Sequence, residues 1–231
     1  MEVELNPGER VDSLNCGGFS VIQNPEHFCF GVDAVCLAEF ASAKKNERVL
    51  DLCTGSGVIP ILMCAKGGGI FTGLELQEAC ADMARRSVAM NGLSGRIKID
   101  SGNLIDSHVF YGTDSFDVIT VNPPYMNEGG GHVSEADCKA VARHEITCNI
   151  KDVCSVSAKL LVFGGRLYMV HRPHRLADVF CALRSAKLEP KRIQFVQGHE
   201  KKPPALVLIE ASYGGRPMLS VLPVKILSHI N

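Results

Sequence analysis

The sequence predicts an α/β fold with a mainly parallel sheet. Along most of its 231 residues, short apolar runs rich in β-branched side chains alternate with longer stretches of helical pattern. Such a succession of βα units requires right-handed crossovers and places the strands parallel in one sheet. The length allows one large domain over residues 1–231, with a hairpin-and-helix extension at 1–45 and a core at 46–231.

The extension carries two local signals. Residues 17–23 contain two glycines followed by an apolar run, and they are expected to pair as a small hairpin. An alanine-rich apolar stretch then predicts a helix over 34–43. Asp33, directly before this stretch, is interpreted either as its N-cap or as a contact to a bound cofactor.

The core reads as alternating strands and helices. Apolar runs bounded by polar or glycine residues predict the strands, and apolar residues at helical spacing predict the helices. The expected strands are 48–52, 69–75, 97–100, 115–121, 165–170, 190–196 and 205–211, and the expected helices are 58–65, 77–91, 143–161 and 173–188.

Composition excludes several classes of protein. The 24 Lys and Arg balance 25 Asp and Glu, and 46% of residues are hydrophobic, as in a globular chain. The basic residues concentrate after residue 115, which favours a polyanionic partner on that side. Ten cysteines without a C-x-x-C pair indicate small buried side chains and no metal site. No apolar run is long enough to cross a membrane, so the chain is expected in the cytoplasm.

A glycine turn follows the first core strand. Asp51 precedes Thr54, Gly55 and Gly57 in the spacing D-x-x-x-G-x-G, and the two glycines allow a ligand to approach the backbone closely. Pro60 stands where a dinucleotide fingerprint has its third glycine, which counts against a nicotinamide cofactor. The spacing is instead typical of S-adenosylmethionine binders.

The next two strands end on polar residues suited to a nucleoside. Glu75 closes the second strand, where a carboxylate can accept hydrogen bonds from both ribose hydroxyls. Asn103 follows the third strand and can hydrogen-bond an adenine. The expected donor site therefore includes Glu75 and Asn103 with their apolar neighbours Leu76 and Leu104.

The run 115–121 stops at Asn122, Pro123, Pro124 and Tyr125, because two prolines forbid further sheet pairing. This arrangement suits methyl transfer to an exocyclic amine. The Asn122 side-chain oxygen and the Pro123 carbonyl can each accept one N–H, and Pro124 fixes the direction of that carbonyl. Tyr125 offers a face for an extruded base. The alternative is a proline turn that only caps a strand.

These residues carry a family resemblance over nearly the whole chain. The stretch 51–57, Glu75, the Asn-Pro-Pro-Tyr tetrapeptide and the closing hairpin resemble class I S-adenosylmethionine-dependent methyltransferases that methylate amino groups. Residues 30–35, 142–145 and 170–173 look like the bacterial tRNA1(Val) adenine-37 N6-methyltransferase family. The resemblance implies a Rossmann-like, seven-stranded sheet with its last strand antiparallel and helices on both faces. It also implies donor contacts by Asp51, Gly55, Gly57, Glu75 and Asn103, and base contacts by Asn122, Pro123 and Tyr125.

Related enzymes often carry Asp at the position of Asn103. Because Asn can still accept and donate hydrogen bonds, donor binding is expected to be kept, with a weaker contact at this position as the alternative. Structured RNA, with tRNA first, is the expected partner, and the oligomeric state is left open. The alternatives are adenine in DNA, guanine N2 in ribosomal RNA, glutamine in a protein, or a non-catalytic RNA-binding fold. The expected substrate contacts, besides Tyr125, are Arg143, His144, Arg172, Lys201 and Lys202, with Arg175 as a further candidate for phosphate.

Overall fold

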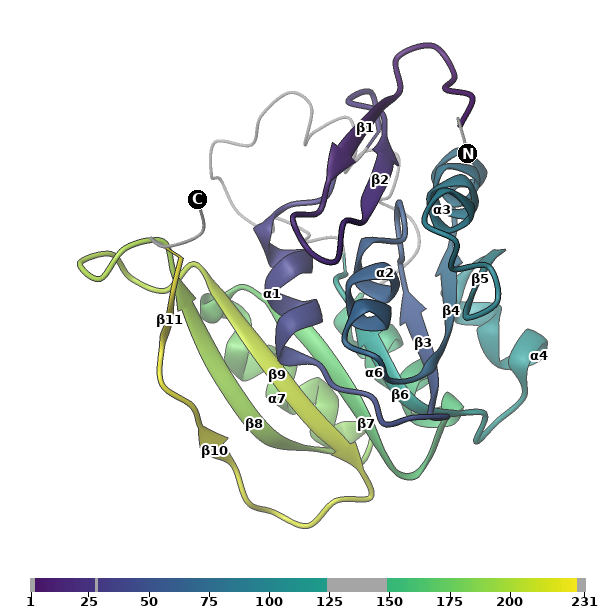
Figure 1. Ribbon diagram of the computed structural model, residues 1–231. Coiled ribbons are helices and arrows are strands. Elements are labelled where there is room, and N and C mark those ends of the chain that lie inside the picture. Colours follow the sequence, from purple (N-terminus) through teal and green to yellow (C-terminus); the bar gives the residue numbers. More distant parts are fainter. Residues whose placement is uncertain (1–2, 28, 124–148, 228–231) are drawn as a thin grey trace.

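The protein has the α/β fold that the sequence predicts. The computed structural model describes residues 3–27, 29–123 and 149–227 (Figure 1). Within these residues one large sheet runs through the centre, helices cover both of its faces, and a small hairpin lies beside it. The expected strands and helices are found with shifts of a few residues at their ends.

Seven strands form the body of the sheet in the order β8-β9-β7-β6-β3-β4-β5. Strand β9 is antiparallel to both of its neighbours, while the other pairs in this body are parallel, which confirms the expected seven strands with the last one antiparallel. The strands are β3 (Arg48–Leu52), β4 (Ile70–Glu75), β5 (Ile97–Ser101), β6 (Phe116–Val121), β7 (Leu161–His171), β8 (Leu188–Gln197) and β9 (Leu206–Tyr213).

The described sheet has two further strands that the sequence did not predict. Strands β10 (Ser220–Val221) and β11 (Lys225–Ile226) both pair parallel with the edge strand β8, which makes nine strands in all. Each has two residues, too few to leave a periodic pattern in the sequence. They cover the β8 edge, which would otherwise present unpaired backbone groups.

The helices divide into two layers. Helices α1 (Val32–Phe40), α2 (Val58–Ala65) and α3 (Glu78–Met90) pack over one face, and α6 (Ile150–Leu160) and α7 (Leu176–Ser185) over the other. Successive strand residues point to opposite faces of the sheet. Val49 packs in the core under α1, α2 and α3, and Leu50 packs in the core under α6 and α7. This alternation explains why both faces of the central strands carry mainly apolar residues. The short elements are η1 (Leu104–Asp106), α4 (Ser107–Tyr111) and η2 (Pro173–Arg175).

The hairpin joins β1 (Arg10–Ser13) to β2 (Ser20–Gln23), so residues 17–23 pair with a preceding segment rather than with themselves. Strand β2 is held on α3 by side chains of that helix. The Ile22 N–H donates to Ser87 Oγ at 2.8 Å, and Asn91 bonds both backbone groups of Ser20. These bonds fasten the extension to the core.

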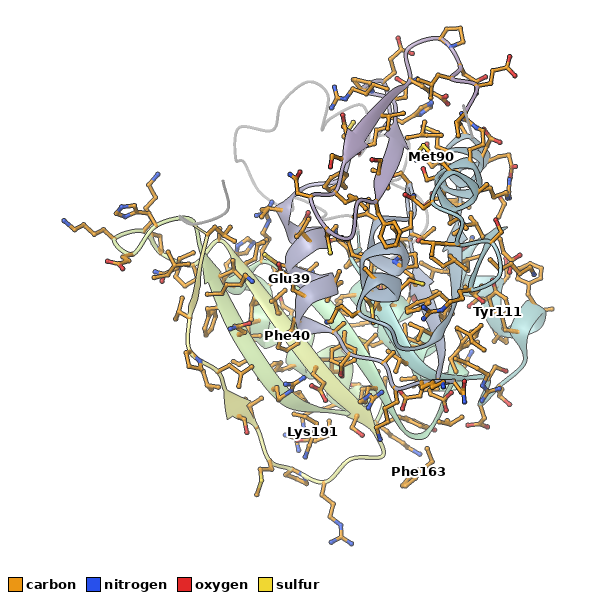
Figure 2. All side chains as sticks on the ribbon, in the orientation of Figure 1. Glu39, Phe40, Met90, Tyr111, Phe163 and Lys191 are labelled. Carbon is orange, nitrogen blue, oxygen red and sulfur yellow. The ribbon has the colours of Figure 1, made fainter. Side chains whose placement is uncertain are left out.

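Helix α1 begins and ends earlier than expected. Its N-cap is Gly31 in extended conformation, and Asp33 lies inside the first turn, so the interpretation of Asp33 as the N-cap is wrong. At the other end Lys66 Nζ donates to the carbonyls of Ala38, Glu39 and Ala41. Figure 2 shows Phe40 of α1 over the sheet, where its ring meets Tyr168 edge to face.

One predicted helix is two elements. Residues 173–188 form η2 followed by α7, which ends at Ser185, and Leu188 already begins β8. Lys187 adopts a left-handed conformation (φ 61°) that turns the chain from the helix into the strand. The beginning of the helix predicted over 143–161 lies outside the described residues, and α6 covers its second part.

Candidate active site

The carboxyl ends of three central strands bring the predicted site residues together. Leu52 of β3 pairs with Leu74 of β4 and with Val121 of β6, so all three strands end at the same level. The glycine turn, Glu75 and Asn122 follow these strands and therefore share one edge of the sheet. This is the edge at which open α/β folds bind ligands.

Asp51 anchors the glycine turn from below. Its carboxylate is fully buried and accepts hydrogen bonds from Thr54 Oγ1 and Thr120 Oγ1, each at 2.6 Å. Burial raises the pKa of Asp51 to about 7, against the two hydroxyl bonds that favour the ionised form. Asp51 thus ties the turn to β3 and β6. Thr120 was not predicted, although a threonine inside the apolar stretch Val118–Val121 was an available signal.

The turn itself depends on glycine at two positions. Gly55 (φ 56°) and Gly57 (φ 82°) both adopt left-handed conformations, which other residues rarely do. A Cβ on Gly55 would have no atom within 4 Å, so the turn borders open space there. Gly73 of β4, which the sequence analysis missed, gives the turn room: a Cβ there would lie 2.8 Å from the Thr54 side chain.

Glu75 holds the opposite side of the turn. Its side chain is 6% exposed, and its carboxylate accepts from the Gly55 N–H at 2.9 Å and from the Gln77 N–H at 3.0 Å. A carboxylate is therefore fixed beside the open space at Gly55. The pattern suits a ligand with vicinal hydroxyls, because each oxygen retains capacity for another donor.

The carboxyl ends of β4 and β5 carry the remaining residues predicted for the donor site. Leu76 follows β4, and Asn103 and Leu104 follow β5. Asn103 caps η1, because its side-chain oxygen accepts from the Ile105 N–H at 3.0 Å. Leu104 is buried, whereas Leu76 is 42% exposed at the end of β4. The capping bond uses one lone pair of the Asn103 side-chain oxygen, so the amide can still accept one further hydrogen bond and donate through its amino group.

Asn122 and Pro123 follow β6 beside the glycine turn. Asn122 Nδ2 donates to Asp33 Oδ2 at 3.1 Å, which connects the end of β6 to the first turn of α1. The structure thus brings Asp33 to the predicted site from 89 residues away in the chain. Pro124 and Tyr125 lie outside the described residues, as do Arg143 and His144.

A basic rim continues along the same edge beyond Asn122. Arg172 follows β7 and is exposed, and its Nη1 donates to the Ala205 carbonyl at 3.4 Å. Ala205 ends the loop between β8 and β9, in which Lys201 and Lys202 are exposed. Arg175, in contrast, pairs with Asp178 at 2.7 Å. Arg172 thus contacts the end of the loop that carries Lys201 and Lys202, and these three residues define the basic rim.

His171 lies between this rim and Asn122, and the sequence analysis did not single it out. Its Nδ1 accepts from the Arg172 N–H at 2.9 Å. Burial lowers the pKa of His171 to about 4, and the nearby guanidinium groups of Arg175 and Arg172 act in the same direction. The imidazole is therefore neutral at physiological pH.

The sequence profile described as "Methyltransferase small domain" matches residues 30–185. The chain belongs to this family. Class I methyltransferases take the methyl group from S-adenosylmethionine, and the chain is a transferase that depends on this donor. The residues present fit it: a glycine turn borders open space at Gly55, and the Glu75 carboxylate is held next to that space.

Curated relatives are similar to this chain over most of its length and most of theirs. A protein of Parabacteroides distasonis named tRNA1(Val) (adenine(37)-N6)-methyltransferase is 27% identical over 205 residues, which are 86% of this chain and 84% of the relative. A protein of Dickeya chrysanthemi with the same name is 27% identical over 227 residues, 93% of this chain and 86% of the relative. The similarity therefore includes the extension as well as the core.

Solved structures show the same fold. A predicted O-methyltransferase of Agrobacterium tumefaciens superposes with a TM-score of 0.67 at 22% identity, over 84% of this chain and 86% of that one. P. horikoshii TYW2, solved in complex with MeSAdo, gives a TM-score of 0.62 at 13% identity, over 91% and 73%. At such identities the likeness establishes the fold of a class I methyltransferase.

The described residues contain neither a candidate membrane-spanning helix nor a candidate metal-binding cluster. There, no helix is both long and apolar enough to span a membrane. Within the same ranges no three His, Cys, Asp or Glu side chains are grouped so that they could hold a metal ion.

Proposed function

We propose that the chain methylates the exocyclic N6 of an adenine in tRNA, with adenosine 37 of tRNA1(Val) as the target. The observation that carries this proposal is the position of Asn122 and Pro123 directly after β6, at the edge that also holds the glycine turn and Glu75. The residues proposed to bind the target amine would thereby lie next to the residues proposed to bind the nucleoside part of the methyl donor. The names of the curated relatives support the choice of base and RNA.

The donor site of the proposal lies over the glycine turn. Bound there, S-adenosylmethionine supplies an activated methyl group on its sulfonium. Glu75 would accept the ribose hydroxyls, and Asp51 would act through the turn because it is fully buried beneath it. The residues assigned to this site are Asp51, Thr54, Gly55, Gly57, Glu75, Leu76, Asn103 and Leu104. The sequence also assigns Asp33 and Asn122 to it, but we propose that these two act mainly at the acceptor, because they hydrogen-bond to each other directly after β6.

The acceptor site centres on Asn122. An exocyclic adenine nitrogen is a poor nucleophile because its lone pair is delocalised into the ring. The Asn122 side-chain oxygen and the Pro123 carbonyl would each accept one N–H, which draws the nitrogen toward tetrahedral geometry and directs its lone pair. The acceptor therefore needs orientation rather than a strong base. Pro124 and Tyr125 complete this site in the proposal, with Tyr125 stacking on the base.

RNA would lie along the basic rim. Arg172, Lys201 and Lys202 extend from the proposed acceptor site along one edge, where they can contact phosphates, and Arg143 and His144 are assigned to the same surface. The chain, with its extension fastened to α3, is proposed to act as one unit of residues 1–231. A tRNA substrate agrees with the expected cytoplasmic location.

The test supplies purified protein and methyl-labelled donor with total tRNA, ribosomal RNA and duplex DNA in parallel. N6-methyladenine in tRNA is expected, and nucleoside mass spectrometry of tRNA from cells lacking the protein should show its loss at adenosine 37. N6-methyladenine in DNA, or N2-methylguanine in ribosomal RNA, with tRNA unlabelled, would refute the proposed substrate. Labelled tRNA that still carries the normal modification at adenosine 37 in the deletion strain would refute the proposed position.

A further inference from the structure

The first turn of α1 and the end of β6 meet through one side-chain pair. Asp33 Oδ2 accepts a hydrogen bond from Asn122 Nδ2 at 3.1 Å, although 89 residues separate the two in sequence. Both side chains are half-buried at the carboxyl edge of the sheet. The bond links the N-terminal extension to the residue that, in the proposed function, accepts a hydrogen bond from the target amine.

From this pair we infer that Asp33 is a positioning residue, which fixes the amide of Asn122 so that its oxygen is presented to the target amine. The inference rests on the proposed function, in which that oxygen accepts an N–H from adenine. An ionised carboxylate can only accept hydrogen bonds, whereas a primary amide has a donating and an accepting side. Asp33 therefore selects the amino side of Asn122 for itself, and the side-chain oxygen is directed elsewhere.

The orientation of the Asn122 amide matters, because the opposite orientation would turn its NH2 group toward the target amine. A half-turn of the Asn122 side chain about its last bond would place its NH2 group against the NH2 group of adenine. Two donors cannot pair, so this orientation would give up the hydrogen bond that orients the nucleophile. It would also place the amide oxygen against the Asp33 carboxylate. The carboxylate thus stabilises one of two otherwise similar rotamers.

Asp33 is itself held in place by its surroundings. Its other oxygen, Oδ1, accepts from the Ala34 N–H at 2.9 Å, in the first turn of a nine-residue helix. The positive end of the helix dipole favours a carboxylate at this point. Gly31 leaves the necessary room: a Cβ at that position would lie 2.8 Å from Asp33 Oδ1. The sequence Gly31-Val32-Asp33 is therefore suited to hold a fixed carboxylate.

The pair also has an electrostatic consequence. A charge-assisted bond to the amide N–H polarises the amide and increases the negative charge on its oxygen. The attacking nitrogen gains positive charge as its bond to carbon forms, so an acceptor backed by a carboxylate stabilises the transition state more than the ground state. Asp33 would do this without taking a proton and without touching the substrate.

The first test is a double-mutant cycle on the single-turnover methylation rate. Asp33→Ala is expected to slow this rate about ten- to a hundredfold, with the donor affinity measured by calorimetry unchanged. If Asp33 acts through Asn122, the double variant Asp33→Ala/Asn122→Ala should be no slower than Asn122→Ala alone. Glu39→Gln, a carboxylate change at the other end of α1, is the matched control and should keep the wild-type rate.

The second test does not depend on activity. In an NMR spectrum of uniformly 15N-labelled protein, the Asn122 side-chain NH2 signals are assigned by their loss in Asn122→Ala. A hydrogen bond to Asp33 predicts that these signals shift in Asp33→Ala and in Gly31→Ala but stay in place in Glu39→Gln. Unmoved signals would overturn the inference even if the protein methylates another substrate.

Three kinetic outcomes would also overturn it. These are a normal single-turnover rate in Asp33→Ala, rate losses that multiply in the double variant, and a weakened donor affinity in Asp33→Ala. The last outcome would return Asp33 to the donor site. Wild-type protein that fails to label tRNA is a different result, because it refutes the proposed function and leaves the NMR test valid.

Discussion

Thr54 and Asp51 are joined beneath the glycine turn by a 2.6 Å hydrogen bond from hydroxyl to carboxylate. The bond makes the conformation of the turn depend on a buried acid rather than on the glycines alone. Because Thr120 bonds the other carboxylate oxygen, one side chain connects the turn with two strands. This arrangement leads to a prediction about the pH dependence of stability.

Asp51 should make the folded protein less stable as the pH rises from about 4 to about 7. Its pKa is raised from 3.8 to about 7 in the folded state, so over this range the folded chain binds a proton that the unfolded chain has lost. The free energy of unfolding therefore falls across the window and this contribution is constant above it. Urea unfolding as a function of pH should show that Asp51→Asn lacks this part of the slope. If the free energy of unfolding changes with pH in the same way in the wild type and in Asp51→Asn, Asp51 does not have a raised pKa in the folded state.

Glu75→Ala should weaken the binding of S-adenosylmethionine about ten- to a hundredfold, the loss expected for a charge-assisted hydrogen bond of about 1.5–3 kcal/mol. Part of the loss of affinity would arise because Glu75→Ala also removes the acceptor of the hydrogen bond from the Gly55 N–H. Glu75→Gln keeps one acceptor and should lose less. Calorimetry on the folded variants measures the affinity, and an unchanged affinity in Glu75→Ala would remove this residue from the donor site.

Asn122→Ala should bind the donor normally and lose most of its single-turnover rate. The reason is that the acceptor role of Asn122 strengthens as the target nitrogen becomes tetrahedral, so its loss affects the transition state more than either ground state. Rapid-quench measurement with saturating donor and RNA tests this. A variant that turns over at a near-normal rate would exclude Asn122 from the chemistry.

Gly73→Ala should destabilise the protein by about 1–3 kcal/mol, the usual cost of overpacking. The added Cβ would lie 2.7 Å from Ile99 Cδ1 and 2.8 Å from the Thr54 side chain, so either the strand or the turn has to move. Gly95→Ala is the matched control, because its Cβ would meet nothing within 4 Å. Urea midpoints compare the two variants, and equal midpoints would show that the turn tolerates displacement.

Replacing Lys201 and Lys202 together by Ala should weaken RNA binding and reduce the salt dependence of the affinity by about one to two in the log–log slope. Lys44 and Lys45 provide a control of equal charge, since they precede β3 at the opposite edge of the sheet and are exposed. Filter binding at several salt concentrations gives the slopes. The same loss in both double variants would mean that net charge, rather than the rim, governs binding.

The sequence by itself determined the order of the elements and predicted most of the residues that meet at the candidate site. The strand 48–52 and the helix 58–65 have the predicted bounds, because an element buried on both sides has mainly apolar residues between polar or glycine ends. The glycine spacing, Glu75 and Asn122 could be placed at one edge, because parallel strands all end on the same side.

Only the tertiary structure decided the contacts between distant segments. The roles of Asp33, Thr120 and Gly73 depend on contacts with Asn122, Asp51 and Thr54, and such pairings leave no periodic signal in the chain. The strands β10 and β11 have two residues each, too few to give a pattern in the sequence, and they are defined by their pairing with the edge of β8. The local pattern thus fixed the elements, while packing brought the Asp33 carboxylate into contact with the Asn122 amide.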